Sequence, residues 1–261
     1  MERSLWTAAT GMAAQQTNMD VIAHNLANVN TTGFKKTRAE FQDLLYQTVT
    51  APGTASSAST NVPQGIQIGL GARTAAVKRI FLQGDFRPTD NPFDLVIEGD
   101  GFFPLVRPDG AQVFTRDGAL TTDENGNLVS SVGYSLDPPI SVPQDAKSLT
   151  VGRDGTVSVR LADETITQIG SIELASFINP TGLQSIGNNL YVPTVASGDP
   201  LLGTPGQDGL GEIGQGFLET SNVSIVTELV DMISAQRAYE LNSRSVRASD
   251  EMLRSLAQLI R

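Results

Sequence analysis

The chain has 261 residues and no cysteine, so it is long enough to bury a core but cannot cross-link one with disulfides. No uncharged apolar run approaches the roughly 20 residues that a membrane-spanning helix needs, and no basic segment followed by a continuous apolar one marks a secretory signal. The net charge of -10 argues against a nucleic-acid partner, because the acidic side chains would repel its phosphates.

The acidic charge is concentrated in the middle of the chain. Residues 1–45 hold four basic and four acidic side chains, residues 46–217 hold nine and eighteen, and residues 218–261 hold five and six. The nearly neutral ends can pack against copies of themselves without accumulating repulsion. This distribution favours association through the two ends, with the middle facing outward.

The first predicted element is a long helix. Side chains along one stripe recur at alternating steps of three and four, the pattern of a helix that packs along another helix. The helix is expected to end within Asn28–Phe34, because Asn, Thr and Gly favour turns over helix interiors. The stripe consists of Leu5, Ala8, Met12, Gln15, Met19, Ile22, Leu26 and Val29.

The next segment carries no charge from residue 44 to residue 72, and Ser, Thr, Ala, Gly and Pro dominate residues 48–65. This composition suits a flexible linker, yet disordered linkers are usually charged. A segment that becomes ordered only against a neighbouring subunit is the alternative, because loops of this length are usually functional or disordered. We assign residues 46–70 to this uncharged extension, after an N-terminal part of residues 1–45.

From Ile66 onward the apolar period changes to two residues, which predicts strands. Glu98–Phe102 lies between two apolar runs and predicts a tight turn joining two strands, and Asn125-Gly126 predicts a hairpin. Short strands separated by Gly, Pro and Asp indicate an all-β domain, placed at residues 71–217. The strand candidates are residues 66–70, 75–81, 95–97, 113–115, 120–122, 128–129, 149–151, 156–159, 165–169, 172–177 and 190–192.

A second long helix is predicted in the last part, residues 218–261, beginning near Ser221 or Asn222, which are good N-cap residues. About 40 residues at 1.5 Å per residue would extend about 60 Å, longer than a domain of this size offers as support. Most of its apolar face must therefore contact a partner helix. The fold class is α+β, with the two terminal helices pairing as a coiled coil around an inserted, mainly β domain.

Chemistry for catalysis is sparse. His24 is the only histidine, and its place within a helix favours packing or hydrogen bonding over catalysis. Gly209–Gly214 matches a dinucleotide-binding pattern without the strand and helix that such a loop needs. Asp123, Asn125 and Asn127 have calcium-loop spacing, but Leu128 replaces the required glycine, so a hairpin turn is favoured. We expect no catalytic, cofactor-binding or metal site, although carboxylates of the middle could still pair after folding.

Several segments resemble the motifs of the flagellar basal-body rod and hook protein family, and together they cover nearly the whole chain. The first lies at the end of the N-terminal helix, the next three in the β domain and the last two near the C-terminal helix. They are Ala27–Lys35, Asp94–Phe103, Phe114–Gly118, Asn125–Val129, Gly216–Val223 and Met232–Glu240.

The resemblance implies a structural subunit without cofactor or metal. In this family the terminal helices pair as a coiled coil that lines a helical tube around an export channel, and the β domain forms the outer layer. Length and the uncharged segment are most similar to the distal rod subunits, with proximal rod and hook paralogues as alternatives. The implied partners are copies of itself, proximal rod proteins, hook protein, rod cap and the L-ring and P-ring proteins.

The resemblance also implies export by the flagellar type III apparatus without a cleaved signal, and a place in the basal body across the periplasm. The distal rod would there act as a rigid drive shaft that transmits torque to the hook. Two other classes remain from the sequence: a secreted hydrolase acting on a polymer such as peptidoglycan, and a free-standing binding module with ordered ends.

We expect two sets of residues to matter for assembly. The first, on the inner helices, forms apolar stripes that pair within one subunit and repeat in neighbours, giving an open helix. The second is the family-signature turn, which either redirects the chain out of the inner tube or simply stops the helix. The first set is Leu5, Met12, Met19, Ile22, Leu26, Val29, Val226, Leu229, Val230, Ile233, Tyr239, Val246, Leu253 and Leu256, and the second is Asn28, Asn30, Thr31, Thr32, Gly33 and Phe34.

Overall fold

The computed structural model describes residues 2–52, 55–57, 60–61 and 64–259. It confirms an α+β fold, with a helix near each end and a mainly β middle. The chain forms two compact units. The helical unit comprises Met1–Ala27, Thr37–Arg79 and Ser224–Arg261, and the β unit comprises Asn28–Lys36 and Ile80–Val223.

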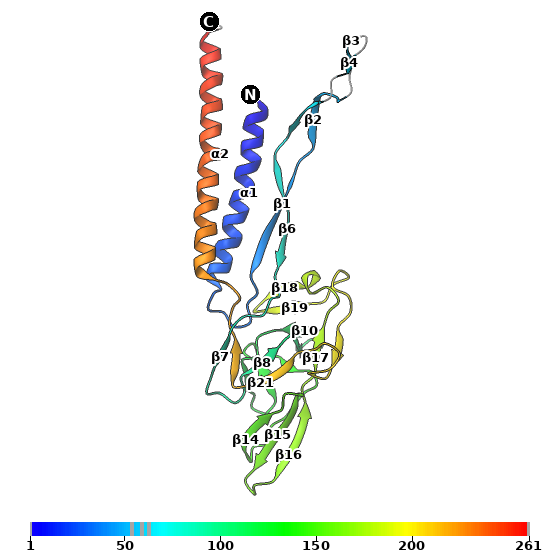
Figure 1. The fold of residues 1–261 in the computed structure, drawn as a ribbon. Helices are drawn as coiled ribbons and strands as arrows, with labels where there is room; N and C mark the ends of the chain where they lie inside the picture. The colour runs from blue at the N-terminus through cyan, green and yellow to red at the C-terminus, as the bar shows by residue number, and fades with distance from the viewer. Residues whose placement is uncertain (1, 53–54, 58–59, 62–63, 260–261) are drawn as a thin grey trace. The chain divides into compact units, whose positions relative to one another are not determined.

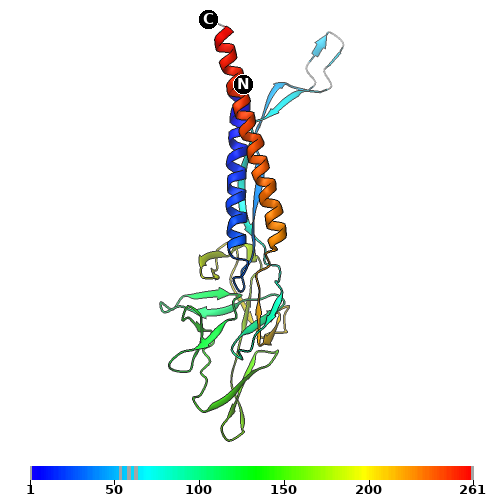
Figure 2. The same ribbon diagram turned by 90° about the vertical axis from the view of Figure 1, so that its left-hand side faces the viewer.

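Within the helical unit, α1 (Glu2–Ala27) and α2 (Ile225–Leu259) lie side by side and run in opposite directions (Figures 1 and 2). The predicted stripe is too long, because α1 ends at Ala27 and Val29 lies in the turn that follows. The predicted start of the second helix is also wrong. Helix α2 begins at Ile225, and the Ser224 carbonyl accepts the Glu228 N–H at 3.0 Å.

A long antiparallel ribbon completes the helical unit and contacts α1 (Figure 1). Its strand pairs are β1–β6, β2–β5 and β3–β4, so the described residues of the uncharged segment form strands in the single chain. Residues 72–79 belong here and not with the β domain, because β6 pairs along β1. The strands are β1 (Thr37–Asp43), β2 (Tyr46–Thr50), β3 (Ala55–Ser57), β4 (Thr60–Asn61), β5 (Ile66–Gly69) and β6 (Ala72–Arg79).

The β unit contains a seven-stranded sheet in the order β11-β12-β13-β9-β10-β19-β18, a three-stranded sheet β14-β15-β16, and the pairs β17–β20, β8–β21 and β7–β22. The strands are β7 (Phe86–Pro88), β8 (Leu95–Glu98), β9 (Phe103–Val106), β10 (Gln112–Thr115), β11 (Leu120–Thr122), β12 (Leu128–Ser130), β13 (Ser135–Leu136), β14 (Ala146–Val151), β15 (Thr156–Leu161), β16 (Ile166–Ser171), β17 (Leu174–Ser176), β18 (Gln184–Gly187), β19 (Leu190–Val192), β20 (Leu201–Gly203), β21 (Glu212–Gln215) and β22 (Phe217–Glu219), with a short 3₁₀ helix η1 (Pro180–Gly182).

The Asn125-Gly126 hairpin is confirmed, since β11 pairs with β12 and the Asp123 side chain accepts hydrogen bonds from the N–H groups of Asn125 and Asn127. The turn predicted at Glu98–Phe102 does not join paired strands. Strand β8 pairs with β21, whereas β9 pairs with β10 and β13. Local alternation thus predicts strands well, while the pairing depends on distant segments.

The core of the β unit is formed by inward side chains of several strands, including Phe103, Leu105 and Val157, all of which are buried. Beside it Phe102 and Phe114 each pack edge-to-face against Phe177, with ring centroids 5.6 and 4.9 Å apart. Such aromatic pairs add specific geometry to apolar burial.

Candidate functional site

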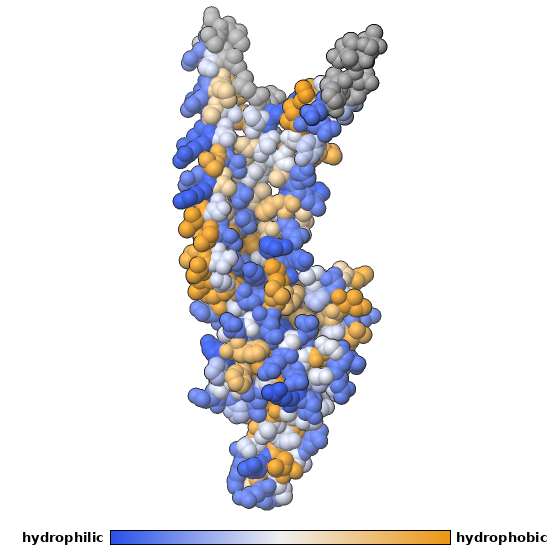
Figure 3. All heavy atoms as spheres, in the orientation of Figure 1, coloured by the Kyte–Doolittle hydropathy of each residue, from blue (hydrophilic) through white to orange (hydrophobic). Residues whose placement is uncertain are grey.

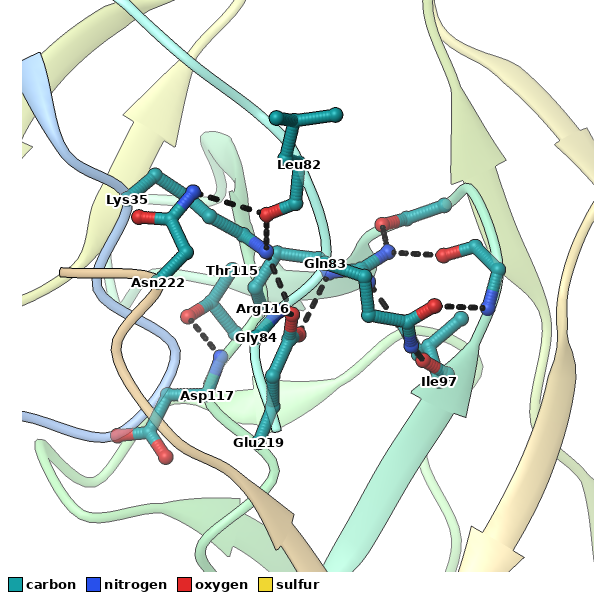
Figure 4. A network of polar contacts seen from close by, with 12 residues as sticks. Lys35, Leu82, Gln83, Gly84, Ile97, Thr115, Arg116, Asp117, Glu219 and Asn222 are labelled. Carbon is teal, nitrogen blue, oxygen red and sulfur yellow. Dashed lines mark hydrogen bonds and ion pairs between the residues drawn. The ribbon is translucent and has the colours of Figure 1, made fainter. Parts of the chain in front are cut away.

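A buried ionic cluster lies in the β unit where its first, middle and last parts meet (Figure 4). Glu219, at the end of β22, pairs through Oε1 with Lys35 Nζ at 2.5 Å and through Oε2 with Arg116 Nε at 3.0 Å. The side chains of Lys35 and Glu219 are 1% exposed and that of Arg116 is 5% exposed. Each carboxylate oxygen therefore has its own cation in a site that solvent does not screen.

Arg116 also binds the backbone that follows β8. Its Nη1 donates to the Gly99 carbonyl at 2.8 Å and to the Gly101 carbonyl at 2.7 Å. These carbonyls therefore turn toward a guanidinium and not toward a partner strand. This explains why Glu98–Phe102 crosses between two pairs of strands without forming a hairpin of its own.

Lys35 and Glu219 each gain a backbone partner near Ile80–Gly84. Lys35 Nζ donates to the Leu82 carbonyl at 2.7 Å, and the Gly84 N–H donates to Glu219 Oε1 at 2.9 Å. Burial lowers the pKa of Lys35, Glu219 opposes this shift, and the charge of Arg116 adds to it. The cluster thus holds two cations and one carboxylate, with backbone carbonyls solvating the excess positive charge.

The turn after α1 is bound into this cluster through Gly33. Gly33 has a φ of +66°, and its N–H donates to the Glu219 carbonyl at 2.8 Å. A Cβ at this position would lie 2.8 Å from the Asp117 nitrogen and 2.9 Å from the Arg116 carbonyl carbon. Both the backbone conformation and the close approach therefore require glycine.

The other residues of the signature turn have separate surroundings. The Asn28 side chain accepts a hydrogen bond from the Thr31 hydroxyl at 3.2 Å, and the Thr32 carbonyl accepts one from Asn189 Nδ2 at 2.7 Å. Phe34 is buried, and Asn30 is exposed. Beyond ending the helix, the turn is therefore bound to distant parts of the β unit through Thr32 and Gly33.

Asn222, predicted as a helix cap, instead joins three segments of the β unit. Its Oδ1 accepts the Lys36 N–H at 2.7 Å, and its Nδ2 donates to the carbonyls of Ile80 and Leu82 at 2.9 Å each. Asn222 and Glu219 together bind residues 33–36 and 80–84, two segments that lie next to the helical unit in the sequence. Glu219 and Asn222 both lie in Gly216–Val223, one of the segments that resemble family motifs. Their spacing gave no indication of the distant residues that they contact.

A second polar junction lies within the helical unit at the end of α1. Asn25 Nδ2 donates to the Thr37 carbonyl at 2.8 Å and to Glu228 Oε2 at 3.2 Å, while its Oδ1 accepts the Thr37 N–H at 2.9 Å. Asn25 and Glu228 are both buried. One amide thus ties α1, β1 and α2 together.

The α1 residues predicted for assembly are mostly half-buried in the single subunit. Leu5, Met12, Met19 and Leu26 are half-buried, and Ile22 is buried. Contacts between the two helices also involve α1 residues one position earlier, among them Ser4, whose hydroxyl lies 3.3 Å from that of Ser249.

The first turns of α2 carry an exposed apolar face, which we call the α2 face and define as Val226, Leu229, Val230 and Ile233. Their exposed fractions are 72%, 43%, 60% and 51%. Figure 3 shows apolar side chains gathered over this part of α2. Further along α2, Tyr239 is exposed at 38%, Val246 and Leu253 are half-buried, and the side chain of Leu256 lies outside the described residues.

The described residues contain no group of three or more metal-ligating side chains, and His24 is exposed on α1. Among the helices of the described ranges, none is long and apolar enough to span a bilayer.

Three family models match the chain. "Flagella basal body rod protein" matches residues 5–35, "Flagellar hook protein FlgE/F/G D1 domain" matches residues 96–159, and "Flagellar basal body rod FlgEFG protein C-terminal" matches residues 215–259. The matches at both ends include the turn, Glu219 and most of both helices.

Three relatives, each named flagellar basal-body rod protein FlgG, are similar to this chain over nearly their full length. The chain is 51% identical to that of Borreliella burgdorferi, with 97% of each chain covered. It is 49% identical to that of Buchnera aphidicola from Schizaphis graminum, covering 98% of this chain and 99% of the relative. It is 40% identical to that of Bacillus subtilis, with 100% of each covered.

Proposed function

The chain belongs to the FlgG family of flagellar basal-body rod proteins, and from this membership we propose that it builds the distal rod as a helical tube of identical subunits. Like its relatives, it is a structural protein of the bacterial flagellum and not an enzyme. The hydrolase considered from the sequence is therefore set aside. Proximal rod and hook paralogues remain the alternatives within the family.

The observation that carries the proposal is the α2 face. Four aliphatic side chains, about half exposed on average, leave apolar surface that copies can bury on assembly. At ~1.5–3 kcal/mol for full burial of each, the remaining exposure corresponds to ~3–7 kcal/mol per contact. A patch repeated on every subunit can join copies in an open helical arrangement when the contact does not close on itself.

In this tube the helices α1 and α2 pair as a coiled coil around the export channel, and the β unit faces outward. The uncharged ribbon of residues 46–70 contacts neighbouring subunits, as its exposed Tyr46, Val49 and Ile66 support. The rod transmits motor torque to the hook. Its further partners are proximal rod proteins, rod cap, hook protein, the L-ring and P-ring proteins and the type III export apparatus.

Charge placed on the α2 face tests the proposal. Ile233→Asp should abolish polymerisation of the purified protein and swimming of a strain that relies on it, because an ionised carboxylate cannot be buried unpaired. Ser234→Asp places the same charge on the neighbouring exposed position and serves as the matched control. Sedimentation and electron microscopy report polymers, and circular dichroism reports whether the monomer is folded. Normal polymers of Ile233→Asp would refute the role of the α2 face, whereas a natural protein that forms no polymers would favour a free-standing binding module.

A further inference from the structure

We propose that polar and small side chains between α1 and α2 select one register of the two helices, with Glu228 and Asn242 as the positioning residues on α2. The inference rests on the proposed function in one respect, since the register would align the outward apolar residues that copies contact. It concerns the single subunit, so it can be tested without polymers.

The contacts between the helices follow a constant register. Each step of seven residues forward along α1 corresponds to seven residues backward along α2, as expected for antiparallel helices with a seven-residue repeat. The same step places Asn18 opposite Ala235, which is buried. The contacts are the Ser4 and Ser249 hydroxyls at 3.3 Å, Gly11 beside the Asn242 amide, and Asn25 Nδ2 to Glu228 Oε2 at 3.2 Å.

These layers are complementary in size. A Cβ added to Gly11 would lie 2.9 Å from Asn242 Nδ2, so the amide occupies the space that the missing side chain leaves. In the next layer the larger residue, Asn18, is on α1 and the smaller, Ala235, is on α2. Small and large residues thus exchange sides between these two middle layers.

A slip by seven residues would destroy this complementarity in either direction. In one direction Gly11 would face Ala235, leaving a gap, and Asn18 would face Glu228, crowding that layer. In the other, Asn18 would face Asn242, placing two amides where the native layer holds one, and Asn25 would face Ala235. Voids and crowding both destabilise a packed contact.

The layers between these four distinguish less strongly between one register of the helices and another. On α1 they are Ala8, Gln15 and Ile22, and on α2 the same spacing places Met232, Tyr239 and Val246 there. Apolar contact is non-directional, so such layers tolerate displacement. Specific polar residues within an apolar repeat are the known means of selecting one register, at some cost in stability.

The lowest layer is fixed to a third element as well. Asn25 binds both backbone groups of Thr37, the first residue of β1, while it donates to Glu228. A slip of α2 would remove Glu228 from Asn25 but leave Asn25 where it is. A displacement of seven residues moves the α2 face by about 10 Å along α1, which would misalign it for a neighbouring copy.

Cysteine pairs can measure the register directly, because the natural chain contains no cysteine. The pair Ala8→Cys with Val246→Cys reports the native register, while Ala8→Cys with Tyr239→Cys or Leu253→Cys reports a slip of seven residues in each direction. None of these positions belongs to the proposed polar layers. The full-length monomer is oxidised mildly, and the disulfide yield of each pair is measured by mass spectrometry.

We expect the native pair to form at least tenfold more disulfide than either slipped pair. In a Glu228→Ala/Asn242→Ala background a slipped pair should rise at least tenfold. The exposed control Gln236→Ala/Glu240→Ala should keep the native pattern, and so should Glu228→Gln, which retains an oxygen that can accept from Asn25. Circular dichroism confirms that the helices persist.

Native-only cross-linking in Glu228→Ala/Asn242→Ala would overturn the inference and assign the register to the chain connections. Slipped cross-links in the natural background or in the exposed control would overturn it too. A failure of polymerisation alone leaves these yields unaffected, so the register and the proposed function are judged separately.

Discussion

Removing the carboxylate of Glu219 should destabilise the β unit far more than removing the ammonium group of Lys35. In Glu219→Leu, Lys35 and Arg116 stay buried without a counter-charge, and the Gly84 N–H loses its acceptor. Breaking a buried pair by removing one partner costs about 3–5 kcal/mol. Because two cations are left here, we expect the upper end of that range.

Lys35→Met should cost only about 1–2 kcal/mol. Glu219 then keeps Arg116 on Oε2 and the Gly84 N–H on Oε1, while a charge that burial already disfavours is removed. In the Glu219→Leu background, Lys35→Met should therefore be neutral or stabilising, because it removes one of the two unpaired cations. The double mutant separates electrostatic coupling from loss of packing.

Native-state hydrogen exchange of Phe103–Val106 and Gln112–Thr115, strands of the β core, gives the free energy of opening for each variant. A loss of about 5 kcal/mol lowers the protection factor by roughly 4,000-fold. Additive losses in the double mutant would refute the reasoning, since the two residues would then act independently.

Three further predictions concern the turn, the β-unit boundary and acid. Gly33→Ala should destabilise the β unit by about 1–3 kcal/mol in thermal unfolding, through the left-handed backbone and the approach to Arg116 and Asp117, whereas Gly110→Ala, with nothing near its Cβ, isolates the backbone cost. A fragment of residues 80–223 should unfold at a lower temperature alone than with a peptide of residues 28–36, which supplies Lys35. Equal unfolding temperatures would show that the contacts of Lys35 do not stabilise the β unit. Hydrogen bonds from Asn127, Thr156 and Thr165 lower the pKa of Asp123, Asp154 and Asp163. The stabilisation by these three carboxylates is therefore present above about pH 4 and is lost as the pH falls through their folded pKa values. In a variant with Asn at all three positions, the free energy of unfolding should fall less steeply as the pH is lowered below about 4.

The sequence predicted the strands and the Asn-Gly hairpin because alternation and turn chemistry are local properties. It could not predict that Lys35, Arg116 and Glu219 meet, because charged residues are normally expected to lie on the surface. Their separation along the chain hides the pairing, and each is buried only because the other two are present.

The helices show a different limit. Apolar periodicity identified both of them, yet on α1 it selected Leu5 and Met12, one residue after Ser4 and Gly11, which contact α2. Periodicity reports which residues need burial without saying whether a partner in the same chain or in another provides it. The exposed Val230 on α2 illustrates the same ambiguity, since the part of the subunit that the structure describes leaves its side chain mostly uncovered.

Labelling cysteines with a maleimide before and after polymerisation shows whether copies meet through the α2 face. Val230→Cys is the probe, and Gln168→Cys on the exposed β16 of the β unit is the reference. If copies bury this face, the rate of labelling at position 230 should fall at least tenfold in polymers, while the rate at position 168 should change little. Unchanged labelling at position 230 in well-formed polymers would contradict it.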